Sequence, residues 1–399
     1  MKKYLVGGAV RDMILRRANN DKDYVVVNSS VEEMLSLGFK SVGKSFPVFV
    51  HADMKGEYAL ARTEKKSGKK HFDFECFTKD VSLEEDLRRR DLTINAIAYD
   101  ENSEAFIDPF GGLDDIEDRV LRPVSAAFKE DALRILRAAR FRAELGEGWR
   151  FDAILKGYAE ELKEELGEIS RERIYKESKK AMQSKKPSLY FKSLLELGVL
   201  ETVFPWIYEL TKIEHDNEYH KEGSVFNHTM MAVDLCADEN AKWAVLFHDV
   251  GKYRAFLEDG NFYRHYDAKI LQSVFNDVQS SLSLSREELE VSKFFALNHH
   301  NLQNIFKNSM RASKIATLLS KIKSKKRLNS LLEATLADLD GRIGAKNELF
   351  FTKEQVAELW GQLKEADYGV DSETMSVEAI KSRIMHKQIQ IVRNFIQIK

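Results

Sequence analysis

The hydrophobic pattern of the chain changes near Gly111, and this change limits the possible folds more than any other feature. Before Gly111, short runs rich in β-branched and aromatic residues alternate with helical stretches. Strands are predicted at residues 3–6, 23–27, 48–51, 58–61, 72–77 and 105–107. After Gly111, helical periodicity continues to the end, and three of the five prolines lie there. We therefore predict an α+β head followed by an all-helical remainder.

Size and composition indicate a soluble globular protein with more than one domain. The 399 residues are 43% apolar and 32% charged, and a chain of this length can form two or three cores. No apolar run approaches the roughly 20 residues that span a bilayer, and the N-terminal residues lack the pattern of a signal peptide. The two cysteines do not form a metal-type pair. We expect a cytoplasmic protein without disulfides or a membrane partner.

One segment of the chain is strongly basic although the net charge is only −2. Residues 301–332 contain eight lysines and arginines and no acidic residue. Such a segment contacts phosphates in many nucleic-acid-binding proteins. The alternative is a solvated helix face beside an acidic neighbour, and the charge pattern alone leaves both interpretations open.

The head begins with two glycines and a spaced pair of aspartates. Gly8 follows a predicted strand and starts a predicted helix, where the backbone can approach a phosphate and Arg11 can reach a triphosphate. Asp21 and Asp23 would lie on one face of a strand, because side chains alternate with period two. Two adjacent carboxylates suit Mg²⁺. Each element alone is typical of an ordinary turn, but their combination favours a nucleotide and metal site.

Two later segments carry further charged residues. Arg90 and Asp91 end a charged run, where they could simply pair with each other or cap a helix. On the next predicted helix, Arg134, Arg137 and Arg140 share roughly one face. Asp131 precedes Arg134 by three residues, which is also the spacing of an ordinary intrahelical salt bridge.

Asp131 and Arg134 could also choose a nucleobase. A carboxylate accepts from the exocyclic amine of cytosine or adenine, and a guanidinium donates to a ring nitrogen of either base. Uracil and guanine present the opposite pattern. An aspartate and an arginine could therefore select C and A without a nucleic-acid template.

A second set of metal-type ligands lies in the helical part. His228 is on a predicted helix, and His248 and Asp249 follow an apolar run and precede a glycine. Imidazole beside carboxylate suits a divalent transition metal. A lone buried histidine is more often a satisfied core residue, so the significance of this set depends on its spacing.

The motifs of the head and neck resemble those of the class II tRNA nucleotidyltransferases, which belong to the polymerase-beta type. The resemblance implies that Asp21 and Asp23 bind Mg²⁺ and that Asp131 and Arg134 read the base. It further implies nucleotide contacts by Gly8, Arg11, Arg90, Asp91, Arg137 and Arg140. CTP, ATP and tRNA are the implied partners, and addition or repair of the 3′-terminal CCA is the implied reaction.

The helical part resembles the HD phosphohydrolase superfamily, as in some bacterial members of the same family. His228, His248 and Asp249 match its ligands, and Asp338 is the expected fourth ligand with Asp340 as the alternative. The resemblance implies 2′-nucleotidase, 2′,3′-cyclic phosphodiesterase and phosphatase activity with Mg²⁺, Ni²⁺ or a similar ion. In place of a His-rich stretch the chain retains only Arg264-His265. Other possible ligands or phosphate contacts are His265, His299 and His300.

Four parts of the chain are expected from these motifs. They are a head with the start of the neck at 1–140, a helical neck and body at 141–212, an HD domain at 213–345 and a helical tail at 346–399. The expected assembly is a monomer or a homodimer. The alternatives are a poly(A) polymerase of the same superfamily and a non-enzymatic RNA-binding protein that contains an HD domain.

Overall fold

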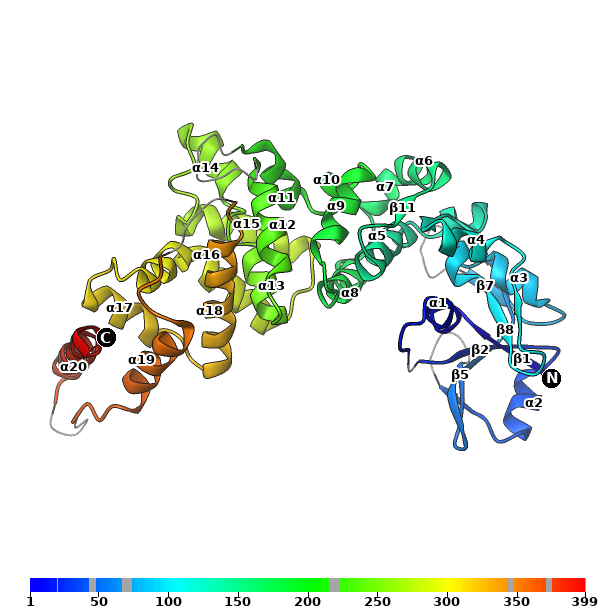
Figure 1. Cartoon of the computed structure of the whole chain (residues 1–399), viewed down its shortest axis with the longest axis horizontal. Coiled ribbons are helices and arrows are strands. Elements are labelled where there is room, and N and C mark those ends of the chain that lie inside the picture. Colours follow the sequence, from blue (N-terminus) through cyan, green and yellow to red (C-terminus); the bar gives the residue numbers. More distant parts are fainter. Residues whose placement is uncertain are drawn as a thin grey trace. The chain divides into compact units, whose positions relative to one another are not determined.

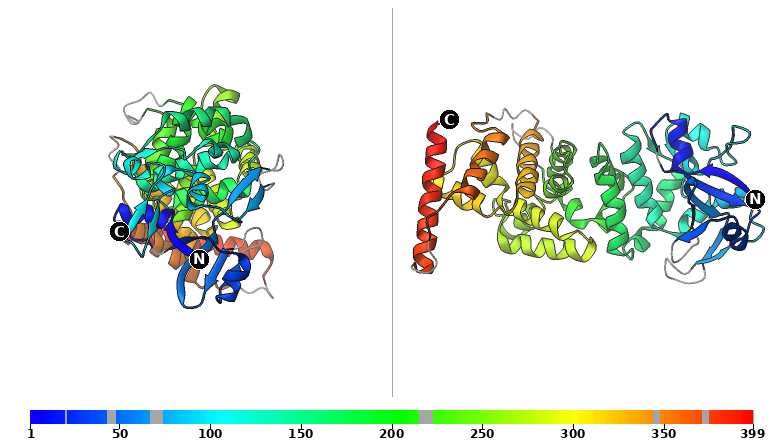
Figure 2. Two further views of the ribbon diagram at one scale, coloured as in Figure 1. Left: turned by 90° about the vertical axis from the view of Figure 1, so that its right-hand side faces the viewer. Right: turned by 90° about the horizontal axis from the view of Figure 1, so that it is seen from below.

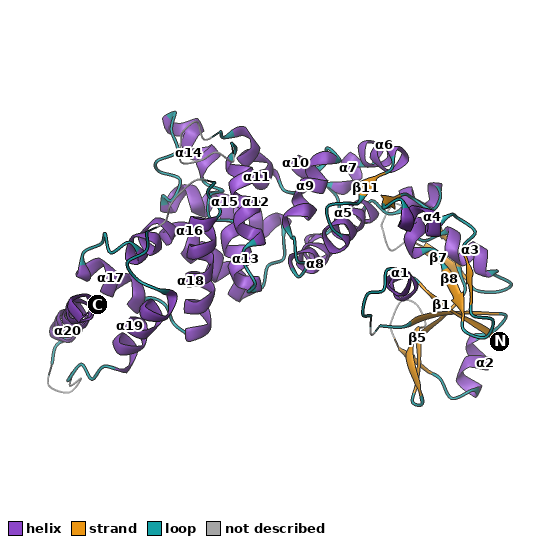
Figure 3. Ribbon diagram, viewed as in Figure 1, coloured by secondary structure: helices purple, strands orange, loops and turns teal. Residues whose placement is uncertain are grey.

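The computed structural model divides the chain into two compact units. Unit 1 comprises Met1–Ala181 and Leu189–Val203, and unit 2 comprises Met182–Ser188 and Phe204–Lys399. The structure describes residues 1–19, 21–42, 48–66, 74–214, 223–343, 348–370 and 375–398. Within these ranges every strand belongs to unit 1 (Figure 3). Also within them, no helix combines the length and apolar character required to cross a lipid bilayer.

Unit 1 is built on a seven-stranded mixed sheet of order β3-β4-β5-β2-β1-β8-β9 (Figure 1). Its strands are β1 (Lys2–Val6), β2 (Asp23–Val27), β3 (Lys40–Val42), β4 (Val48–His51), β5 (Met54–Leu60), β8 (Ala98–Asp100) and β9 (Ala105–Ile107). β2 and β5 are parallel, whereas β1 is antiparallel to both β2 and β8. The register pairs Val6 with Asp23. The glycines after β1 therefore lie next to the start of β2.

Both faces of the central strands are buried. Val25 and Val27 of β2 pack in a core with Leu87, which lies on α3 (Leu83–Arg88). On the alternate positions, Tyr24 stacks on Tyr58 with 4.7 Å between the ring centroids. Each fully buried Val or Leu contributes about 1.5–3 kcal/mol, so this core fixes β2 and the residues at its start.

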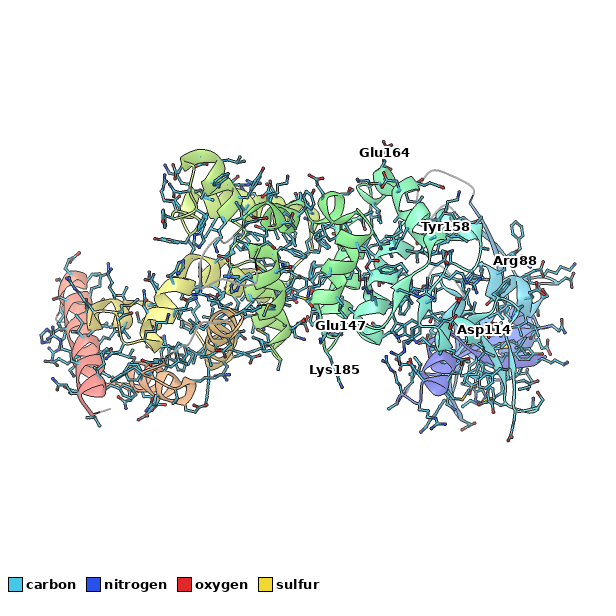
Figure 4. All side chains as sticks on the ribbon, turned by 45° about the horizontal axis from the view of Figure 1, so that its top comes forward. Arg88, Asp114, Glu147, Tyr158, Glu164 and Lys185 are labelled. Carbon is cyan, nitrogen blue, oxygen red and sulfur yellow. The ribbon has the colours of Figure 1, made fainter. Side chains whose placement is uncertain are left out.

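The helices of unit 1 are mostly short. They are α1 (Gly8–Ile14), α2 (Val31–Ser36), α3, α4 (Gly112–Glu117), α5 (Leu133–Leu145), α6 (Ala153–Glu161), α7 (Lys163–Leu166), α8 (Arg171–Met182) and α10 (Leu200–Val203), while α9 (Ser188–Glu196) starts in unit 2. A 3₁₀ turn, η2 (Ala126–Glu130), precedes α5. Its Phe128 stacks on Tyr158 of α6, and Figure 4 labels Tyr158. This contact anchors the segment that leads into α5.

Unit 2 is entirely helical in its described residues (Figure 2). Its helices are α11 (Pro205–Tyr208), α12 (Val225–Asp234), α13 (Glu239–Leu246), α14 (Lys252–Asp259), α15 (Ala268–Ser281), α16 (Arg286–Phe306), α17 (Ala312–Ser320), α18 (Lys325–Asp340), α19 (Lys353–Glu365) and α20 (Val377–Ile398). The central helix α13 packs against α12, α16 and α18, and its Trp243 is fully buried. The predicted α+β head and helical remainder are confirmed.

Several short elements differ from the prediction. The 3₁₀ helix η1 (Thr93–Asn95) and the strands β3, β8, β10 (Val120–Leu121) and β11 (Arg150–Phe151) were not predicted. The strand β6 (Thr63–Lys66), which pairs with β7 (Phe74–Phe77), was also not predicted. Residues 67–73 lie outside the described ranges.

The basic segment at 301–332 gives one clear outcome. Nε and NH2 of Arg327 donate to Glu287 at 2.7 and 2.6 Å, and NH2 also lies 2.6 Å from Glu290. Both acids are on α16, so Arg327 faces an acidic neighbour as the second interpretation held. For the lysines of this segment, contact with phosphates stays a prediction.

Candidate active sites

One cavity of about 660 Å³ in unit 1 brings the predicted nucleotide-site residues together. Its wall includes Gly8, Arg11, Asp21, Asp23, Arg90, Asp91, Asp131, Arg134, Arg137 and Arg140. These residues come from α1, β2 and the residues just before it, the segment after α3, and α5 and the residues just before it. Gly8 and Arg140 are 132 positions apart in the sequence, and the volume is in the range of known ligand pockets, roughly 300–1,000 Å³.

The two expected metal ligands lie at the start of β2. The prediction that both occupy one strand is wrong, because β2 begins at Asp23 and Asp21 precedes it in irregular structure. The backbone N–H of Asp21 instead donates to the side chain of Asn19 at 2.8 Å. Both carboxylates still line the same cavity, together with Gly7 and Gly8.

The electrostatics at Asp23 suit a bound cation. Desolvation, together with the negative charges of Glu57 and Asp21, raises the pKa of Asp23, and Arg90 opposes the shift. A divalent cation would relieve this repulsion, and Mg²⁺ prefers such carboxylate oxygens. The donor set of Asp21 and Asp23 therefore fits the expected ion.

Arg11 is more enclosed than its expected triphosphate contact requires. It is 6% exposed, and its Nε and NH2 donate to Asp12 at 2.9 and 2.8 Å. Its NH1 donates to Asn95 at 2.9 Å. Asn19 in turn donates to Asp12 at 2.7 Å. Arg11 thus joins α1 to the 3₁₀ helix η1, and Asp12 joins α1 to Asn19.

Arg90 and Asp91 form their hydrogen bonds with other residues. The alternative in which they pair with each other therefore does not match the structure. Arg90 NH2 donates to Asp86 at 3.1 Å. Asp91 is buried and accepts from Asn95 at 3.1 Å and from Arg137 Nε at 2.8 Å. Burial opposes ionisation of Asp91, but Arg137 and Asn95 outweigh it and lower its pKa. Asp91 is therefore a charged anchor for α5.

Asp131 and Arg134, the two residues expected to read the base, lie at the beginning of α5. The alternative of a salt bridge within the helix does not match the structure, because α5 begins at Leu133 and Asp131 is extended. Its Oδ1 accepts from the N–H of Leu133 at 3.1 Å, and its Oδ2 accepts from Arg173 at 2.7 Å. Arg134 NH1 donates to the carbonyl oxygen of Ala127 at 2.8 Å. Both side chains are held in fixed positions at the cavity wall.

Arg137 and Arg140, the other two expected site arginines of α5, are held by the buried acid Glu177. Arg140 is 6% exposed, and its Nε donates to Glu177 at 2.6 Å while NH1 contacts Glu144 at 2.5 Å. Arg137 NH1 lies 3.8 Å from Glu177. Sequence reasoning did not assign functional roles to Arg173 and Glu177, which both lie on α8.

The predicted histidine and aspartate ligands meet in a second cavity, of about 450 Å³, in unit 2. Nε2 of His228 on α12 lies 3.1 Å from Oδ1 of Asp338 on α18. Nε2 of His248 lies 3.1 Å from Oδ2 of Asp249 and 3.6 Å from Oδ1 of Asp338. Asp338 is fully buried, whereas Asp340 is exposed. The structure therefore places Asp338, and not Asp340, in the cluster.

The charges of this cluster are strongly coupled. Burial disfavours the imidazolium form of His248, but Asp249 and Asp338 outweigh burial and raise its pKa. Burial also opposes ionisation of Asp249. His248 and Lys252 nevertheless hold the pKa of Asp249 well below its usual value. Lys252 Nζ donates to Asp249 Oδ2 at 2.7 Å. The ligand atoms of His228, His248 and Asp249 lie within 4.8 Å of one another, which suits a metal ion.

A glycine brings a second histidine group against this cluster. A Cβ on Gly251 would lie 2.1 Å from the carbonyl oxygen of His265, so only glycine permits this approach. His265, His299 and His300 also have their ligand atoms within 4.8 Å of one another. Burial lowers the pKa of His265 to about 4. Gln303, which donates to Asp338 at 2.5 Å, was not predicted.

Comparisons with known proteins agree with this arrangement. A family model described as the poly A polymerase head domain matches residues 3–122, and one described as a probable RNA and SrmB-binding site of polymerase A matches residues 158–210. The multifunctional CCA protein of Shewanella denitrificans is 39% identical over 361 residues, which are 88% of this chain and 86% of that protein. That of Mannheimia succiniciproducens is 36% identical and covers 90% and 89%.

Solved structures share the fold. The Bacillus stearothermophilus CCA-adding enzyme in complex with CTP has a TM-score of 0.65 at 23% identity, covering 98% of this chain and 89% of that one. A CCA-adding enzyme in complex with ATP has a TM-score of 0.63 at 21% identity, covering 98% and 87%. The expected polymerase-beta type of head is confirmed. The sequence identity to the two relatives, and the share of both chains that it covers, show that the chain belongs to the multifunctional CCA protein family of CCA-adding nucleotidyltransferases.

Proposed function

We propose that the cavity of unit 1 adds and repairs the 3′-terminal CCA of tRNA from CTP and ATP. The observation that carries this proposal is the composition of one cavity wall. The wall combines two carboxylates, which are suitable ligands for Mg²⁺, with the side chains of Asp131 and Arg134, which can hydrogen-bond to a nucleobase. Four further arginines, Arg11, Arg90, Arg137 and Arg140, supply positive charge for a triphosphate.

Asp21 and Asp23 are proposed as the Mg²⁺ ligands. Bound Mg²⁺ would activate the 3′-hydroxyl of tRNA and stabilise the departing pyrophosphate. The protein groups around it position the nucleotide. Asp91 accepts from Arg137 and Asn95, and a carboxylate has about four lone-pair sites, so it can still accept from a ribose 2′-hydroxyl.

Base choice is proposed to depend on Asp131 and Arg134. Asp131 Oδ2 accepts from the exocyclic amine of C or A, and Arg134 donates to a ring nitrogen of the same base. Arg173 and the carbonyl of Ala127 hold the two side chains in place. A rigid pair can reject U and G, because each would leave a buried group without its partner.

Replacing Asp21 tests the proposed metal role. Asp21→Ala should abolish the addition of both C and A to tRNA, since one of two metal ligands is lost, and should leave phosphohydrolase activity intact. Extension assays with radiolabelled CTP or ATP would measure this. Asp53→Ala, at an exposed aspartate outside the cavity wall, is the matched control. Near-normal extension by Asp21→Ala would refute the ligand assignment.

A second function is proposed for unit 2, where the histidine and aspartate cluster favours phosphohydrolase chemistry. We assign it 2′-nucleotidase, 2′,3′-cyclic phosphodiesterase and phosphatase activity with Mg²⁺, Ni²⁺ or a similar ion. Lys252 and Arg342 line the same cavity and supply positive charge for a phosphate. His228→Ala should abolish hydrolysis but not CCA addition, with the exposed His386→Ala as control. Retained hydrolysis in His228→Ala would remove His228 from the site.

Several further assignments belong to the same proposal. The division at 1–140, 141–212, 213–345 and 346–399 is the proposed functional organisation. A cytoplasmic monomer or homodimer that binds tRNA fits the proposed reactions. A poly(A) polymerase is the competing function of unit 1. It would extend RNA with an unlimited run of A, whereas the proposed enzyme stops after one A.

A further inference from the structure

The cavity of unit 2 joins its buried histidine and aspartate cluster to two exposed tyrosines. The wall of this cavity, which has a volume of about 450 Å³, includes His248 and Asp249 of the cluster together with Phe262, Tyr263 and Tyr266. Tyr263 is 77% exposed and Tyr266 is 47% exposed, whereas His248 is 1% exposed. We call Tyr263 and Tyr266 the tyrosine rim, because they bring aromatic surface and solvent together at a cavity that also contains buried charged groups.

The tyrosine rim stands on a segment between α14 and α15 that hydrogen bonds hold in place. The backbone N–H of Tyr263 donates to Oδ1 of Asn261 at 3.1 Å. Nδ1 of His265 lies 2.7 Å from the carbonyl oxygen of Phe262, and the carbonyl oxygen of His265 packs against Gly251. Because His265 is 3% exposed, it anchors the segment from the inside. An aromatic surface held in this way loses little conformational freedom when a ligand binds.

Tyr266 is connected to the buried cluster by a series of ring contacts. Its ring centroid lies 5.2 Å from that of His265 and 5.5 Å from that of His300, at interplanar angles of 81° and 76°. The ring centroid of His300 lies 4.2 Å from that of His299, which is 5.3 Å from that of His248. A small molecule that fills the cavity therefore contacts both the tyrosine rim and the cluster.

Positive charge lies at the end of the cavity that holds the cluster. Lys252 Nζ is 5.7 Å from the ring centroid of Phe262, and Arg342 NH2 is 3.3 Å from Oδ1 of Asp338. Ammonium and guanidinium groups bind phosphate. A molecule that uses both ends of the cavity carries a phosphate and a flat apolar ring, and nucleoside monophosphates combine these two groups. The cavity volume is in the range of small-molecule sites, roughly 300–1,000 Å³.

We infer that the tyrosine rim stacks on the nucleobase of a nucleoside 2′-phosphate or 2′,3′-cyclic phosphate, whose phosphate group lies at the histidine and aspartate cluster. Stacking on an aromatic side chain accepts every base, because each base has a π-face. The tyrosine rim therefore selects nucleosides over other phosphate esters without choosing one base. The inference rests on the phosphohydrolase function proposed for unit 2 and specifies the part of the substrate that Tyr263 and Tyr266 recognise.

Two substrates separate recognition of the base from the chemistry at the phosphate. Both 2′-AMP and glycerol 2-phosphate are phosphate monoesters of a secondary alcohol, but only 2′-AMP carries a base. We expect the full chain with Tyr263→Ala and Tyr266→Ala together to lose about tenfold in kcat/KM for 2′-AMP, which corresponds to about 1.4 kcal/mol and lies within the range for stacking of a base on aromatic side chains. Its kcat/KM for glycerol 2-phosphate should not change.

Two further variants control this experiment. Tyr263→Phe together with Tyr266→Phe should keep the parent kcat/KM for both substrates, because the ring and not the hydroxyl group carries the stacking. Phe256→Ala should also keep both values, since Phe256 is an exposed aromatic residue of α14 outside the cavity wall. Circular dichroism and the rate of CCA addition check that each variant is folded.

Two kinetic results would overturn the inference. An unchanged kcat/KM for 2′-AMP in the double alanine variant would show that the tyrosines do not contact the base. Equal losses for 2′-AMP and glycerol 2-phosphate would show that the tyrosines only support the neighbouring histidines.

Failure of the phosphohydrolase function would be seen separately. If the parent protein hydrolyses neither substrate, the function proposed for unit 2 is wrong, and equilibrium dialysis with 2′-AMP tests the tyrosine rim by itself. Excess CTP occupies unit 1 in that experiment. About tenfold weaker binding of 2′-AMP by the double alanine variant would support the tyrosine rim, and equal binding would overturn it.

Discussion

Glu177 is the buried acid that holds the arginines of α5, and its replacement gives a quantitative test of the cavity in unit 1. Glu177 is 5% exposed and accepts from Arg140 Nε at 2.6 Å. Breaking a buried ion pair by removing one partner costs about 3–5 kcal/mol, because the other charge stays buried. Arg140 keeps Glu144, whose side chain is 30% exposed. We therefore expect Glu177→Ala to lower the free energy of unfolding by about 3 kcal/mol, the lower end of the range.

The same change should weaken nucleotide binding without altering base choice. Arg137 and Arg140 would lose a common partner, and a loss of about 1.4 kcal/mol in their contacts raises KM about tenfold. Asp131 and Arg134 have other partners, so the preference for C and A over U and G should not change.

Urea unfolding and steady-state kinetics with CTP and ATP measure these effects. Glu177→Gln keeps the size and one acceptor oxygen, so it should cost about half as much, on the order of 1.5 kcal/mol. Glu164→Ala, at the exposed residue of α7 labelled in Figure 4, is the control and should have no effect. A Glu177→Ala protein that loses less than about 1 kcal/mol and keeps its KM would refute the role of Glu177.

Three other predictions test separate parts of the account. Arg134→Ala should allow incorporation of U and G, measured with single nucleotides; unchanged selectivity would end the base-reading model. Burial opposes ionisation of Asp86, but Arg90 and Arg89 outweigh it and lower the pKa of Asp86. The stability that the ionised Asp86 adds is therefore present above its usual pKa and is lost as the pH falls through the lowered value. Asp86→Asn should therefore destabilise the protein at pH 7, and a difference that does not shrink below about pH 4 would contradict this assignment. Gly251→Ala should unfold or distort unit 2, because its Cβ would lie 2.1 Å from the carbonyl oxygen of His265. The control Gly157→Ala, in open space on a helix, should stabilise the protein by up to about 1 kcal/mol. Equal melting temperatures for the two variants would exclude the close approach.

The sequence predicted the main elements that position the first site. β2 and β4 have the predicted bounds, because buried β-branched and aromatic runs define them. The glycines and the aspartates were expected to cooperate, and the pairing of Val6 with Asp23 explains how they meet. The expectation that Asp21 shares this strand with Asp23 was wrong, since local pattern does not show where hydrogen bonding to a neighbouring strand begins.

Long-range partners could not be read from the sequence. Arg137 pairs with Asp91 across 46 positions, and Arg140 pairs with Glu177 across 37. These pairs depend on how α5 and α8 pack on the head, which residue spacing does not encode. Short strands such as β3 are defined by their neighbours alone, because all three of its residues are exposed.

The choice of Asp338 over Asp340 as the expected fourth ligand could have been argued more closely from the sequence. Asp338 and Asp340 are two positions apart on α18, so they point to different sides of the helix. Leu331, Thr335 and Asp338 follow the i, i+4, i+7 pattern of a buried face, and the first two are buried in the structure. Helical periodicity therefore favoured Asp338 before the fold was known.

The most direct test of the central claim supplies a tRNA without its 3′ CCA and each nucleotide singly, then CTP with ATP. With Mg²⁺ present, the account predicts two C residues from CTP, then one A, then no further addition. It also predicts no incorporation of U or G. An unlimited A tail on any RNA would contradict the account in favour of a poly(A) polymerase. No extension at all would leave the cavity of unit 2 as the only working site.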